Sequence, residues 1–553
     1  MPVPQGEHVH DQNPPISTTI PATSGPERPW WPDAVIYEVY IRSLADSDGD
    51  GTGDLQGVID RLDHIQALGV NAVWITPFFP SPGHDHGYDV SDFRGIDPTF
   101  GDTETFRRLV ADLHGRGMRL LVDVVPNHTS HEHPWFRAAI AEGRGGTEYR
   151  DYYLWSDPGP DGGPPNNWLA NFGGSAWTWE PRSEQYYLHA YLPEQPDLNW
   201  RNPRVVEEWV DILAHWIDLG ADGFRIDVAH NLLKHPDLPD NPVLEVAATE
   251  HVPAGRVRSA RGLDRVYDVD QDEVVDLFAR LRERLPRTHA GEEPFLLGET
   301  VLERPDRVER YLQAGRLDAA MWFGTDRVSF EAAEVARVLR TPGADTAGTF
   351  GWFLSNHDRA RPASRLGSAD RALALAAAVL AMPGPYLLYQ GEELGMLDLE
   401  IDPHTARDPI ARRAGELDVS RDRARSPIPW TDEPGRGFST AEPWLAHGPL
   451  PEHGSAATQH GDVRSHLNRW RGLLSTWAGL RHQLPASASV DHDADLLTLT
   501  RGTLTVWVNF GGEAVPLKRP AGAEILWRSQ PGGDPATLRA GEAVWLREPT
   551  RGT

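Results

Sequence analysis

The sequence predicts a (β/α)8 barrel with a subdomain inserted after the third strand and a C-terminal antiparallel β domain. Three observations predict this fold. Eight short apolar runs alternate with helical patterns, a stretch rich in Gly, Pro, Asn and Trp interrupts the alternation once, and short strands separated by Gly, Pro and Asp follow residue 484. Eight strand–helix units favour a closed parallel barrel over an open doubly wound sheet, because no Gly-rich phosphate loop follows the first strand.

The apolar runs come in the order that such a barrel needs. The run at 120–125 is rich in β-branched residues and apolar on both faces, which is typical of a parallel strand covered by helices. The eight expected strands occupy residues 35–44, 71–78, 120–125, 223–229, 295–300, 319–324, 349–358 and 386–393. Apolar residues at helical spacing predict helices at 55–68, 106–113 (capped by Asp102 or Thr103), 205–217, 369–382 and 467–482.

Breaks in these patterns divide the 553 residues into domains. The N-terminal stretch is rich in Pro, Ser and Thr and has no periodicity, which predicts a disordered tail, and it lacks the apolar core of a signal peptide. The predicted domains are the tail at 1–29, the barrel at 30–128 and 201–483, the inserted subdomain at 129–200, a polar insertion within the barrel at 394–465, and an antiparallel β-sandwich domain at 484–553.

Composition excludes several classes of partner. Lys and Arg total 53 and Asp and Glu total 81, which gives a formal charge of −28. A field of that sign repels phosphate backbones and anionic lipid, so neither nucleic acid nor a membrane is expected as a partner. The chain has no cysteine, which excludes disulfides, thiolate metal sites and Cys nucleophiles. We expect a cytoplasmic enzyme without an organic cofactor, either a monomer or a weak homo-oligomer.

Charged residues stand at the ends of four expected strands. A barrel places its chemistry at the C-terminal ends of its strands. The third, fourth, fifth and seventh ends carry DVVPNH (123–128), GFRIDVAH (223–230), GET (298–300) and SNHD (355–358). A charge beside apolar strand residues is costly unless it is paired, so four such ends on one rim indicate a site rather than four turn or capping residues.

Two of these carboxylates have the surroundings that cleavage of a glycosidic bond requires. Arg225 stands two residues before Asp227, so on a strand both side chains point to one face, and the guanidinium would keep Asp227 ionised. Glu299 has no basic neighbour in sequence, and an apolar setting near a second carboxylate would keep it protonated. A third carboxylate and two imidazoles are suited to bind sugar hydroxyls: Asp358, His357 and His128.

Together these motifs resemble the α-amylase superfamily, glycoside hydrolase family 13, over nearly all of residues 30–550. QPDLNW (195–200) is similar to the stretch that separates its oligo-1,6-glucosidase and α-glucosidase branch from endo-acting amylases. Three further stretches are similar to actinobacterial-type α-glucosidases: YDVDQDEV (267–274), LYQGEELG (388–395) and RSPIPW (425–430). The resemblance therefore implies a retaining, exo-acting α-glucosidase acting on a small oligosaccharide or α-glucoside, with transglucosylation when a sugar replaces water.

The resemblance also implies roles for individual residues. Asp227 would be the nucleophile, Glu299 the general acid/base and Asp358 the transition-state stabiliser. Arg361 is expected to pair with Asp85 and so close the pocket at its far end. The remaining residues expected at the glucose subsite are Tyr88, His128, Phe172, Arg225 and His357.

Linkage preference is left open by two cues. Val228 after the nucleophile accompanies α-1,6 preference in parts of the branch, whereas the longer string DVAH (227–230) is similar to enzymes acting on maltose-type α-1,4 substrates, which we favour. RLDAAMWFGTDRV (316–328) departs from the family's pattern after the sixth strand. An oligo-1,6-glucosidase, a glucosyl-transferring isomerase of the trehalose synthase or sucrose isomerase type, and a carbohydrate-binding protein without turnover are the alternatives.

A second cluster of carboxylates lies in DSDGDGTGD (46–54), before the first helix. Alternating Asp with Gly at the bend is typical of an oxygen-ligated Ca²⁺ loop, and the alternative is a solvated acidic turn that caps the helix. By resemblance to the oligo-1,6-glucosidase branch, the backbone carbonyl of Thr52 would be a further ligand. The expected ligands of a structural Ca²⁺, with Mg²⁺ as the other candidate ion, are Asp46, Asp48, Asp50, Thr52 and Asp54.

Overall fold

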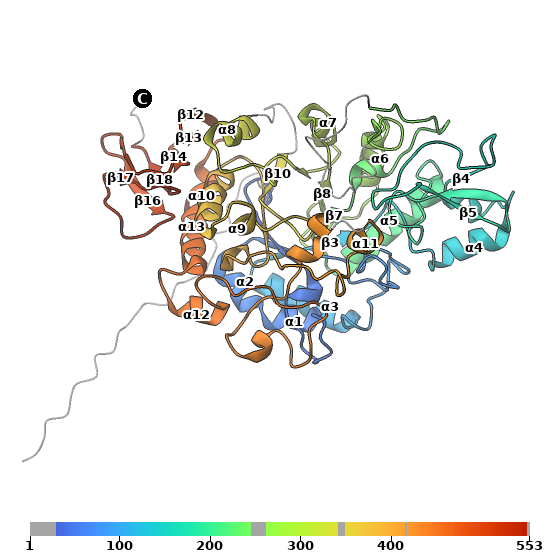
Figure 1. Ribbon diagram of the computed structural model, residues 1–553, viewed down its shortest axis with the longest axis horizontal. Helices are drawn as coiled ribbons and strands as arrows, with labels where there is room; N and C mark the ends of the chain where they lie inside the picture. The colour runs from blue at the N-terminus through green and yellow to red at the C-terminus, as the bar shows by residue number, and fades with distance from the viewer. Residues whose placement is uncertain (1–28, 245–261, 341–348, 415–416, 550–553) are drawn as a thin grey trace, which may run out of the picture. The chain divides into compact units, whose positions relative to one another are not determined.

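Eight parallel strands close into a barrel, as the alternation of strands and helices predicts (Figure 1). The computed structural model describes residues 29–244, 262–340, 349–414 and 417–549, so the predicted tail at 1–29 lies outside the described residues except for its last one. Around the barrel the strands follow the order β1-β11-β10-β9-β8-β7-β3-β2. They are β1 (Val35–Val39), β2 (Ala72–Ile75), β3 (Arg119–Val124), β7 (Gly223–Ile226), β8 (Phe295–Glu299), β9 (Ala319–Met321), β10 (Thr349–Phe353) and β11 (Tyr386–Tyr389).

All eight predicted strands are confirmed, and most of them end earlier than the apolar runs suggest. Asp227 directly follows β7, Glu299 is the last residue of β8, and Asp358 lies five residues beyond β10. Strand residues are almost completely buried, and even the charged Glu38 of β1 has no exposed surface. The functional side chains therefore stand where the buried strands give way to loops.

Helices surround the barrel, and their amphipathic faces explain where they pack. In α5, for example, Trp209, Leu213 and Trp216 are buried at helical spacing. Asp102 caps α3, since its carboxylate accepts the N–H of Thr105 at 2.8 Å. The helices are α1 (Leu55–Asp60), α2 (Leu62–Leu68), α3 (Thr103–Gly115), α4 (Pro134–Glu142), α5 (Pro203–Asp218), α6 (Val274–Arg282), α7 (Pro305–Glu309), α8 (Ala332–Arg340), α9 (Pro362–Arg365), α10 (Ala369–Leu380), α11 (Pro409–Ala414), α12 (Ala456–Gly461) and α13 (His466–Leu480).

The helix predicted at 55–68 is interrupted at Arg61, which separates α1 from α2. Arg61 leaves the helical conformation, and its guanidinium lies 4.4 Å from the ring of Trp430 while Nη2 donates to the carbonyl of Gly437. Both partners belong to the polar insertion at 394–465. A contact across more than 360 residues thus overrides the local helical pattern, which a periodicity argument cannot anticipate.

The segment after β3 forms a small three-stranded antiparallel sheet in the order β4-β6-β5, with α4 beside it. Its strands are β4 (Trp155–Ser156), β5 (Trp177–Glu180) and β6 (Gln185–Leu188). The end of this segment returns to the barrel, where the N–H of Leu198 donates to the carbonyl of Asn127 at 2.9 Å. The insertion therefore comes back to the loop that carries His128.

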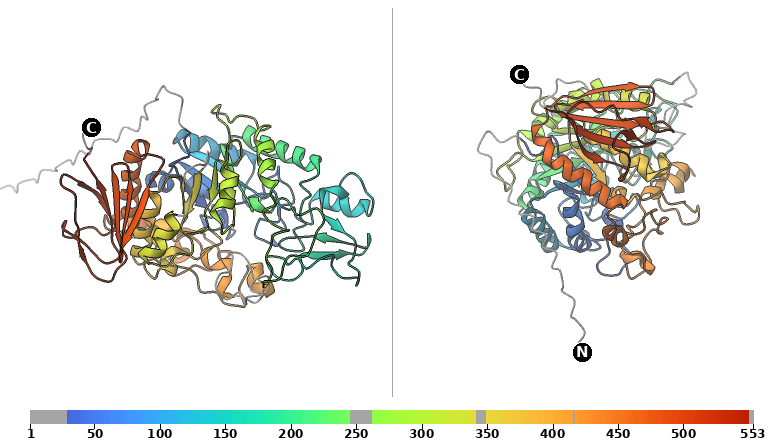
Figure 2. Two further views of the ribbon diagram at one scale, coloured as in Figure 1. Left: turned by 90° about the horizontal axis from the view of Figure 1, so that it is seen from above. Right: turned by 90° about the vertical axis from the view of Figure 1, so that its left-hand side faces the viewer.

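The chain ends in an antiparallel sheet of five strands, shown in Figure 2, and a separate pair of short strands. Trp545 of β18 joins this sheet to the barrel helices, because its Nε1 donates to the carbonyl of Ala377 in α10 at 3.1 Å. The first strand, β12, has the polar sequence SVDHD, which an apolar pattern would not indicate as a strand. The strands are β12 (Ser489–Asp493), β13 (Leu496–Arg501), β14 (Leu504–Asn509), β15 (Val515–Pro516), β16 (Glu524–Arg528), β17 (Thr537–Leu538) and β18 (Ala543–Arg547).

The polar insertion at 394–465 packs against the residues that follow β1. Trp430 Nε1 donates to the carbonyl of Leu44 at 2.6 Å, and the N–H of Ile428 donates to the carbonyl of Ser43 at 3.0 Å. Within the described residues the single-turn 3-10 helices are η1 (Ile41–Ser43), η2 (Arg150–Tyr152), η3 (Ala229–Asn231), η5 (Arg310–Leu312), η6 (Glu392–Leu394), η7 (Leu417–Val419), η8 (Arg421–Ala424), η9 (Pro434–Gly437) and η10 (Arg481–Gln483). This packing brings η8 to the rim of the barrel.

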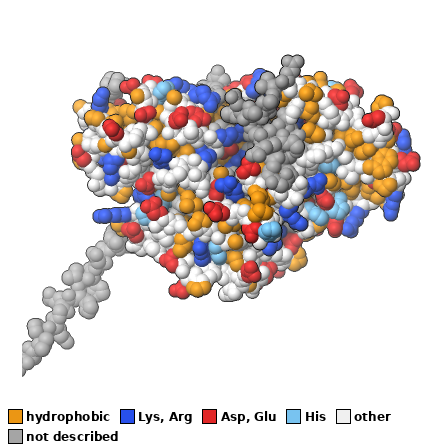
Figure 3. All heavy atoms as spheres, in the orientation of Figure 1, with side chains coloured by type: hydrophobic (Ala, Val, Ile, Leu, Met, Phe, Trp, Pro, Cys, Tyr) orange, Lys and Arg blue, Asp and Glu red, His pale blue; other side chains and the backbone are white. Residues whose placement is uncertain are grey.

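Acidic and basic side chains are interspersed on the face of the molecule drawn in Figure 3, where they alternate with small apolar areas. The charge of −28 is therefore not gathered into one continuous acidic patch on that face. None of the helices in the described ranges combines the length and the apolarity needed to cross a bilayer.

Candidate active site

One pocket opens where the C-terminal ends of the barrel strands meet. Seven of the ten residues predicted for the sugar site line it: Asp85, Tyr88, His128, Phe172, Asp227, Glu299 and Asp358. The pocket also has lining residues that the sequence did not indicate as a group: Asn171, Tyr191, Val228, His230, Asn231, Val301, Arg359 and Arg421. The other three predicted residues, Arg225, His357 and Arg361, are buried behind this lining.

Arg225 joins the two predicted catalytic carboxylates. Its Nη1 lies 2.6 Å from Asp227 Oδ1, and its Nη2 lies 3.0 Å from Glu299 Oε2. The guanidinium is 1% exposed and also contacts Asp123 Oδ1 at 3.0 Å. The expectation that Arg225 and Asp227 share a face of the strand is confirmed. A single guanidinium thus holds Asp227 and Glu299 in fixed positions on one pocket wall.

In this cluster one positive charge faces three carboxylates, and burial has the largest effect on the pKa values of Asp227 and Asp123. Burial raises the pKa of Asp227, the neighbouring Glu299 charge raises it further, and Arg225 opposes both. Burial likewise raises the pKa of Asp123, to about 6. Arg225 opposes the rise at Asp227 from 2.6 Å, but burial outweighs it, so the guanidinium alone does not hold the pKa of Asp227 low, contrary to the prediction from the sequence.

Val228 adopts a conformation that β-branched residues rarely take, with φ 37° and ψ 48°. Its N–H donates to Glu299 Oε2 at 3.0 Å. The left-handed turn directly after Asp227 therefore helps to fix the position of Glu299. Backbone strain of this kind costs about 1–3 kcal/mol and persists only where the surroundings impose it.

Asp358 lies between two arginines and an imidazole. Its Oδ1 lies 2.5 Å from Arg425 Nη2, 3.5 Å from His357 Nε2 and 3.9 Å from Arg421 Nη1. Burial alone would raise the pKa of Asp358, but His357, Arg421 and Arg425 outweigh it and hold this pKa below its usual range. Asp358 is thus an anion beside the pocket at neutral pH. Glu38 acts on Asp358 through His357, since Glu38 Oε1 accepts the N–H of His357 and lies 2.6 Å from His357 Nδ1.

Tyr88 forms the floor of the same end of the pocket. Its ring stacks on His357 with centroids 5.4 Å apart and an interplanar angle of 11°, and its hydroxyl lies 2.8 Å from His357 Nε2. The hydroxyl also donates to Asp123 Oδ2 at 3.0 Å. His128 is placed by the backbone of this residue, because its Nε2 lies 3.1 Å from the Tyr88 carbonyl. A flat, hydrogen-bonding surface of this kind suits a sugar ring.

The predicted pair of Asp85 and Arg361 was wrong. Arg361 is fully buried and donates from Nη1 and Nη2 to the carbonyls of Gln390 and Ala424, at 2.9 and 2.8 Å. The arginine that pairs with Asp85 is Arg421, whose Nη2 lies 2.5 Å from Asp85 Oδ1. The guanidinium of Arg361 instead joins the end of β11 to the insertion at 394–465, and these two hydrogen bonds keep it from Asp85.

Asp408 also holds Arg421, since Asp408 Oδ1 lies 2.8 Å from the same Nη2. Its guanidinium also lies 4.8 Å from the ring of Phe172, the predicted pocket aromatic. These contacts could not be predicted from the sequence, because Arg421 is 336 residues from Asp85 and lies in an insertion without a recognised motif. Arg425 was also missed, although it begins the quoted stretch RSPIPW.

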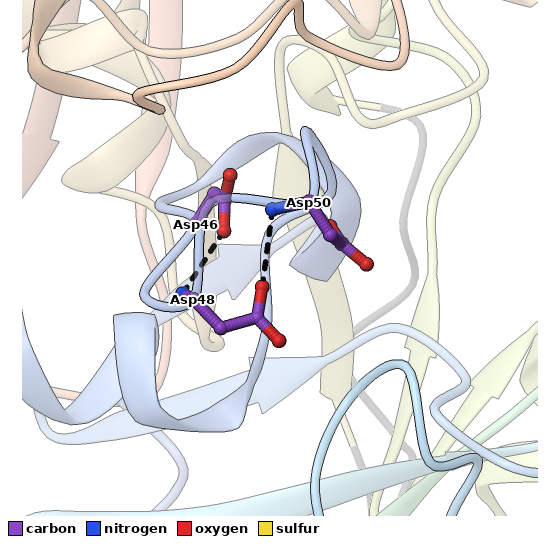
Figure 4. Close-up of side chains that lie close together, drawn as sticks. All are labelled: Asp46, Asp48 and Asp50. Atoms are coloured by element: carbon purple, nitrogen blue, oxygen red, sulfur yellow. Dashed lines mark hydrogen bonds between the residues drawn. The ribbon is translucent and has the colours of Figure 1, made fainter.

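The loop before α1 gathers three of its carboxylates, as Figure 4 shows. One oxygen each of Asp46, Asp48 and Asp50 lies within 4.8 Å of the others. Asp46 Oδ1 accepts the N–H of Asp48, and Asp48 Oδ1 accepts the N–H of Asp50. Asp54 is not part of this group, because it accepts N–H bonds from Ser47 and Gly57 and caps α1. The N–H of Thr52 donates to Asp50 Oδ1 at 2.7 Å.

A closed barrel with an arginine-bridged pair of carboxylates in a pocket at its strand ends defines a glycoside hydrolase. The family described as Alpha amylase, catalytic domain, matches residues 38–483, and the chain belongs to this family.

Relatives of known description cover most of the chain. A probable alpha-glucosidase of Rhizobium meliloti is 38% identical over 83% of this chain and 84% of its own length. An oligo-1,6-glucosidase of Heyndrickxia coagulans is 34% identical over 75% of this chain and 79% of its own. Among solved structures, an alpha-glucosyl transfer enzyme superposes with a TM-score of 0.85 at 35% identity, covering 95% of this chain and 100% of its own.

Proposed function

We propose that this chain is a retaining, exo-acting α-glucosidase that releases α-glucose from the non-reducing end of short α-glucosides. The observation that carries the proposal is the pair formed by Asp227 and Glu299, both bound to Arg225 and both lining one pocket. Retention needs two carboxyl groups close together, about 5–5.5 Å apart, because one of them attacks the sugar directly. A single guanidinium that bridges both groups supports such a close approach.

In the proposed reaction, Asp227 attacks the anomeric carbon and displaces the leaving oxygen, which takes a proton from Glu299. Water then enters, Glu299 removes its proton, and the bond between Asp227 and glucose breaks, which restores both carboxyl groups. Positive charge develops on the sugar ring in each transition state. The ionised Asp358, which Arg425 and Arg421 hold beside the pocket, would stabilise that charge.

Exo action is supported by the closed end of the pocket. The ion pair of Asp85 and Arg421 lines the pocket beside His128, since Gln195 Nε2 lies 3.2 Å from Asp85 Oδ2 and 3.1 Å from His128 Nε2, so a chain extending beyond the bound glucose would meet a buried, paired charge. A sugar that enters would present its non-reducing end to this wall. One glucose unit is then released in each turnover.

Among possible substrates, maltose-type α-1,4 glucosides are favoured by the DVAH string, although Val228 lines the pocket and its side chain accompanies α-1,6 preference elsewhere. Glucosyl transfer to a sugar is a second candidate activity, because a solved alpha-glucosyl transfer enzyme shares the fold closely. Transfer uses the same covalent intermediate and differs only in what attacks it. A cytoplasmic location and a monomeric or weakly oligomeric state belong to the proposal as well.

The deciding experiment is incubation with maltose, isomaltose, sucrose and trehalose, with the anomer of the released glucose followed by NMR. An α-glucosidase gives α-glucose first, and a glucosyl-transferring isomerase gives a rearranged disaccharide. The Asp227→Ala variant should release nothing. If the wild type binds these sugars without converting any of them, the chain is a carbohydrate-binding protein and the proposed function is wrong.

A structural Ca²⁺ in the loop before α1 is also proposed. Three carboxylates in reach of one another on a Gly-rich bend have the hard oxygen donors that Ca²⁺ prefers, and Mg²⁺ is the other candidate. Asp46, Asp48 and Asp50 would hold the ion together with the Thr52 carbonyl, and the ion would stiffen the loop that precedes α1. Thermal unfolding with Ca²⁺, Mg²⁺ or a chelator tests this. Asp48→Asn should abolish the gain in Tm, whereas Asp495→Asn, an exposed carboxylate elsewhere, should retain it.

A further inference from the structure

Arg359 lines the pocket directly after Asp358, in the loop that follows β10. The segment after β9 contacts it, and β9 lies across the closed barrel from β2, the strand that leads to Asp85. Since Asp85 and Arg421 close the opposite end, this side faces whatever is attached to the glucose. The mechanism described above leaves Arg359 without a role.

The guanidinium of Arg359 is fixed in position by the segment after β9. It lies 5.0 Å from the ring of Phe323, and its Nε lies 3.1 Å from Asp326 Oδ2. The Asp326 side chain has no exposed surface, whereas that of Arg359 is 13% exposed. Phe323 and Asp326 both belong to the stretch 316–328, where the sequence departs from the family's pattern.

The outer nitrogens of this guanidinium are available to a ligand. Neither Nη1 nor Nη2 of Arg359 makes a hydrogen bond to any residue of the described ranges, and neither is among the buried side-chain atoms. Three carboxylates, Asp326, Asp358 and Glu299, act on the charge of Arg359 against one further cation, Arg327. The site therefore offers two N–H-bearing groups without a net positive charge, which suits neutral hydroxyls better than an anion.

We propose that Arg359 binds the sugar of the leaving group, and that Phe323 and Asp326 position it, so that the enzyme distinguishes hydroxyl-bearing leaving groups from flat aromatic ones. The proposal rests on the α-glucosidase function proposed above. The same contact would serve a sugar acceptor, which approaches the covalent intermediate from this side. Arg359 is then a specificity residue for both hydrolysis and transfer.

The test compares kcat/KM for maltose and for 4-nitrophenyl α-D-glucoside. In Arg359→Gln the ratio of the two values should fall about tenfold or more, because hydrogen bonds from a charged donor are lost with one substrate only. The matched control is Arg327→Gln. Arg327 lies 3.8 Å from the same carboxylate of Asp326 but does not line the pocket, so the ratio should change by less than about twofold.

A second readout keeps the proposal testable if the Gln variant folds poorly. Arg359→Lys keeps the charge and loses the forked donor, and it should lower the ratio of glucosyl transfer to hydrolysis when maltose is added as acceptor. Equal losses with both substrates, or an equal change in the Arg327 control, would overturn the proposal. If the wild type cleaves neither substrate nor any other α-glucoside, the proposed function fails instead.

Discussion

Replacing Arg421 by Gln tests whether the ion pair with Asp85 closes the pocket. Arg421 is 6% exposed and contacts Asp85 at 2.5 Å, Asp408 at 2.8 Å and Asp358 at 3.9 Å. Without it, two buried carboxylates lose their nearest cation. Breaking a buried ion pair by removing one partner costs about 3–5 kcal/mol, so the free energy of unfolding should fall by about that amount at neutral pH.

The loss of stability should depend on pH in a direction that the carboxylates fix. Arg421 lowers the pKa of Asp408 and Asp358 in the folded protein, so their contribution is present above the unfolded pKa of about 4 and disappears as pH falls through the folded value. Burial raises the pKa of Asp85 even with Arg421 present, and the loss of Arg421 would raise the pKa of Asp85 further. Protonation of these carboxylates removes the unpaired charges from the variant. The difference in free energy of unfolding between wild type and variant should therefore become smaller from pH 7 to pH 4.

Urea unfolding of the wild type and variant at pH 7, 5 and 4 measures the deficit, and kcat/KM with maltose measures the effect on substrate binding. The control is Arg423→Gln, since Arg423 lies two residues away, is 40% exposed, and approaches its nearest carboxylate at only 3.7 Å. Its effect should stay below about 1 kcal/mol. A pH-independent deficit, or equal effects of the two variants, would refute the assignment of Arg421 to the pocket wall.

Three further outcomes are expected. Asp227→Ala should lose turnover, and added azide should restore cleavage of α-glucosyl fluoride with a β-glucosyl azide product; an α-linked azide would contradict the nucleophile assignment. Glu38→Gln should lower kcat/KM about 10–100-fold without changing the linkage preference, because Glu38 orients His357 through Nδ1. A Glu38 variant with wild-type kinetics would rule out this orienting role. Val228→Gly should relieve backbone strain and raise the ratio of the maltose rate to the isomaltose rate. An unchanged ratio of these two rates would exclude Val228 from linkage selection.

Local pattern was enough to predict most of the fold. Strand and helix periodicities are set by which residues face the core, so the eight barrel strands and the flanking helices could be located from apolar spacing. The polar strand β12 and the break at Arg61 escaped because pairing with β13 and contact with Trp430 decide them. Neither interaction leaves a mark on the neighbouring sequence.

The residues of the candidate site likewise divide into those that local sequence predicts and those that long-range contacts decide. Asp227, Glu299 and Asp358 could be predicted because each stands at or beyond the end of a buried strand, where a charge is costly unless it is paired. The roles of Arg421 and Arg359 could not, since each depends on side chains from a different loop. Local sequence was sufficient to predict the barrel and the carboxylates on its rim. Which arginine neutralises which carboxylate follows from the folded chain, because charge pairing depends on distance in space and not on separation along the chain.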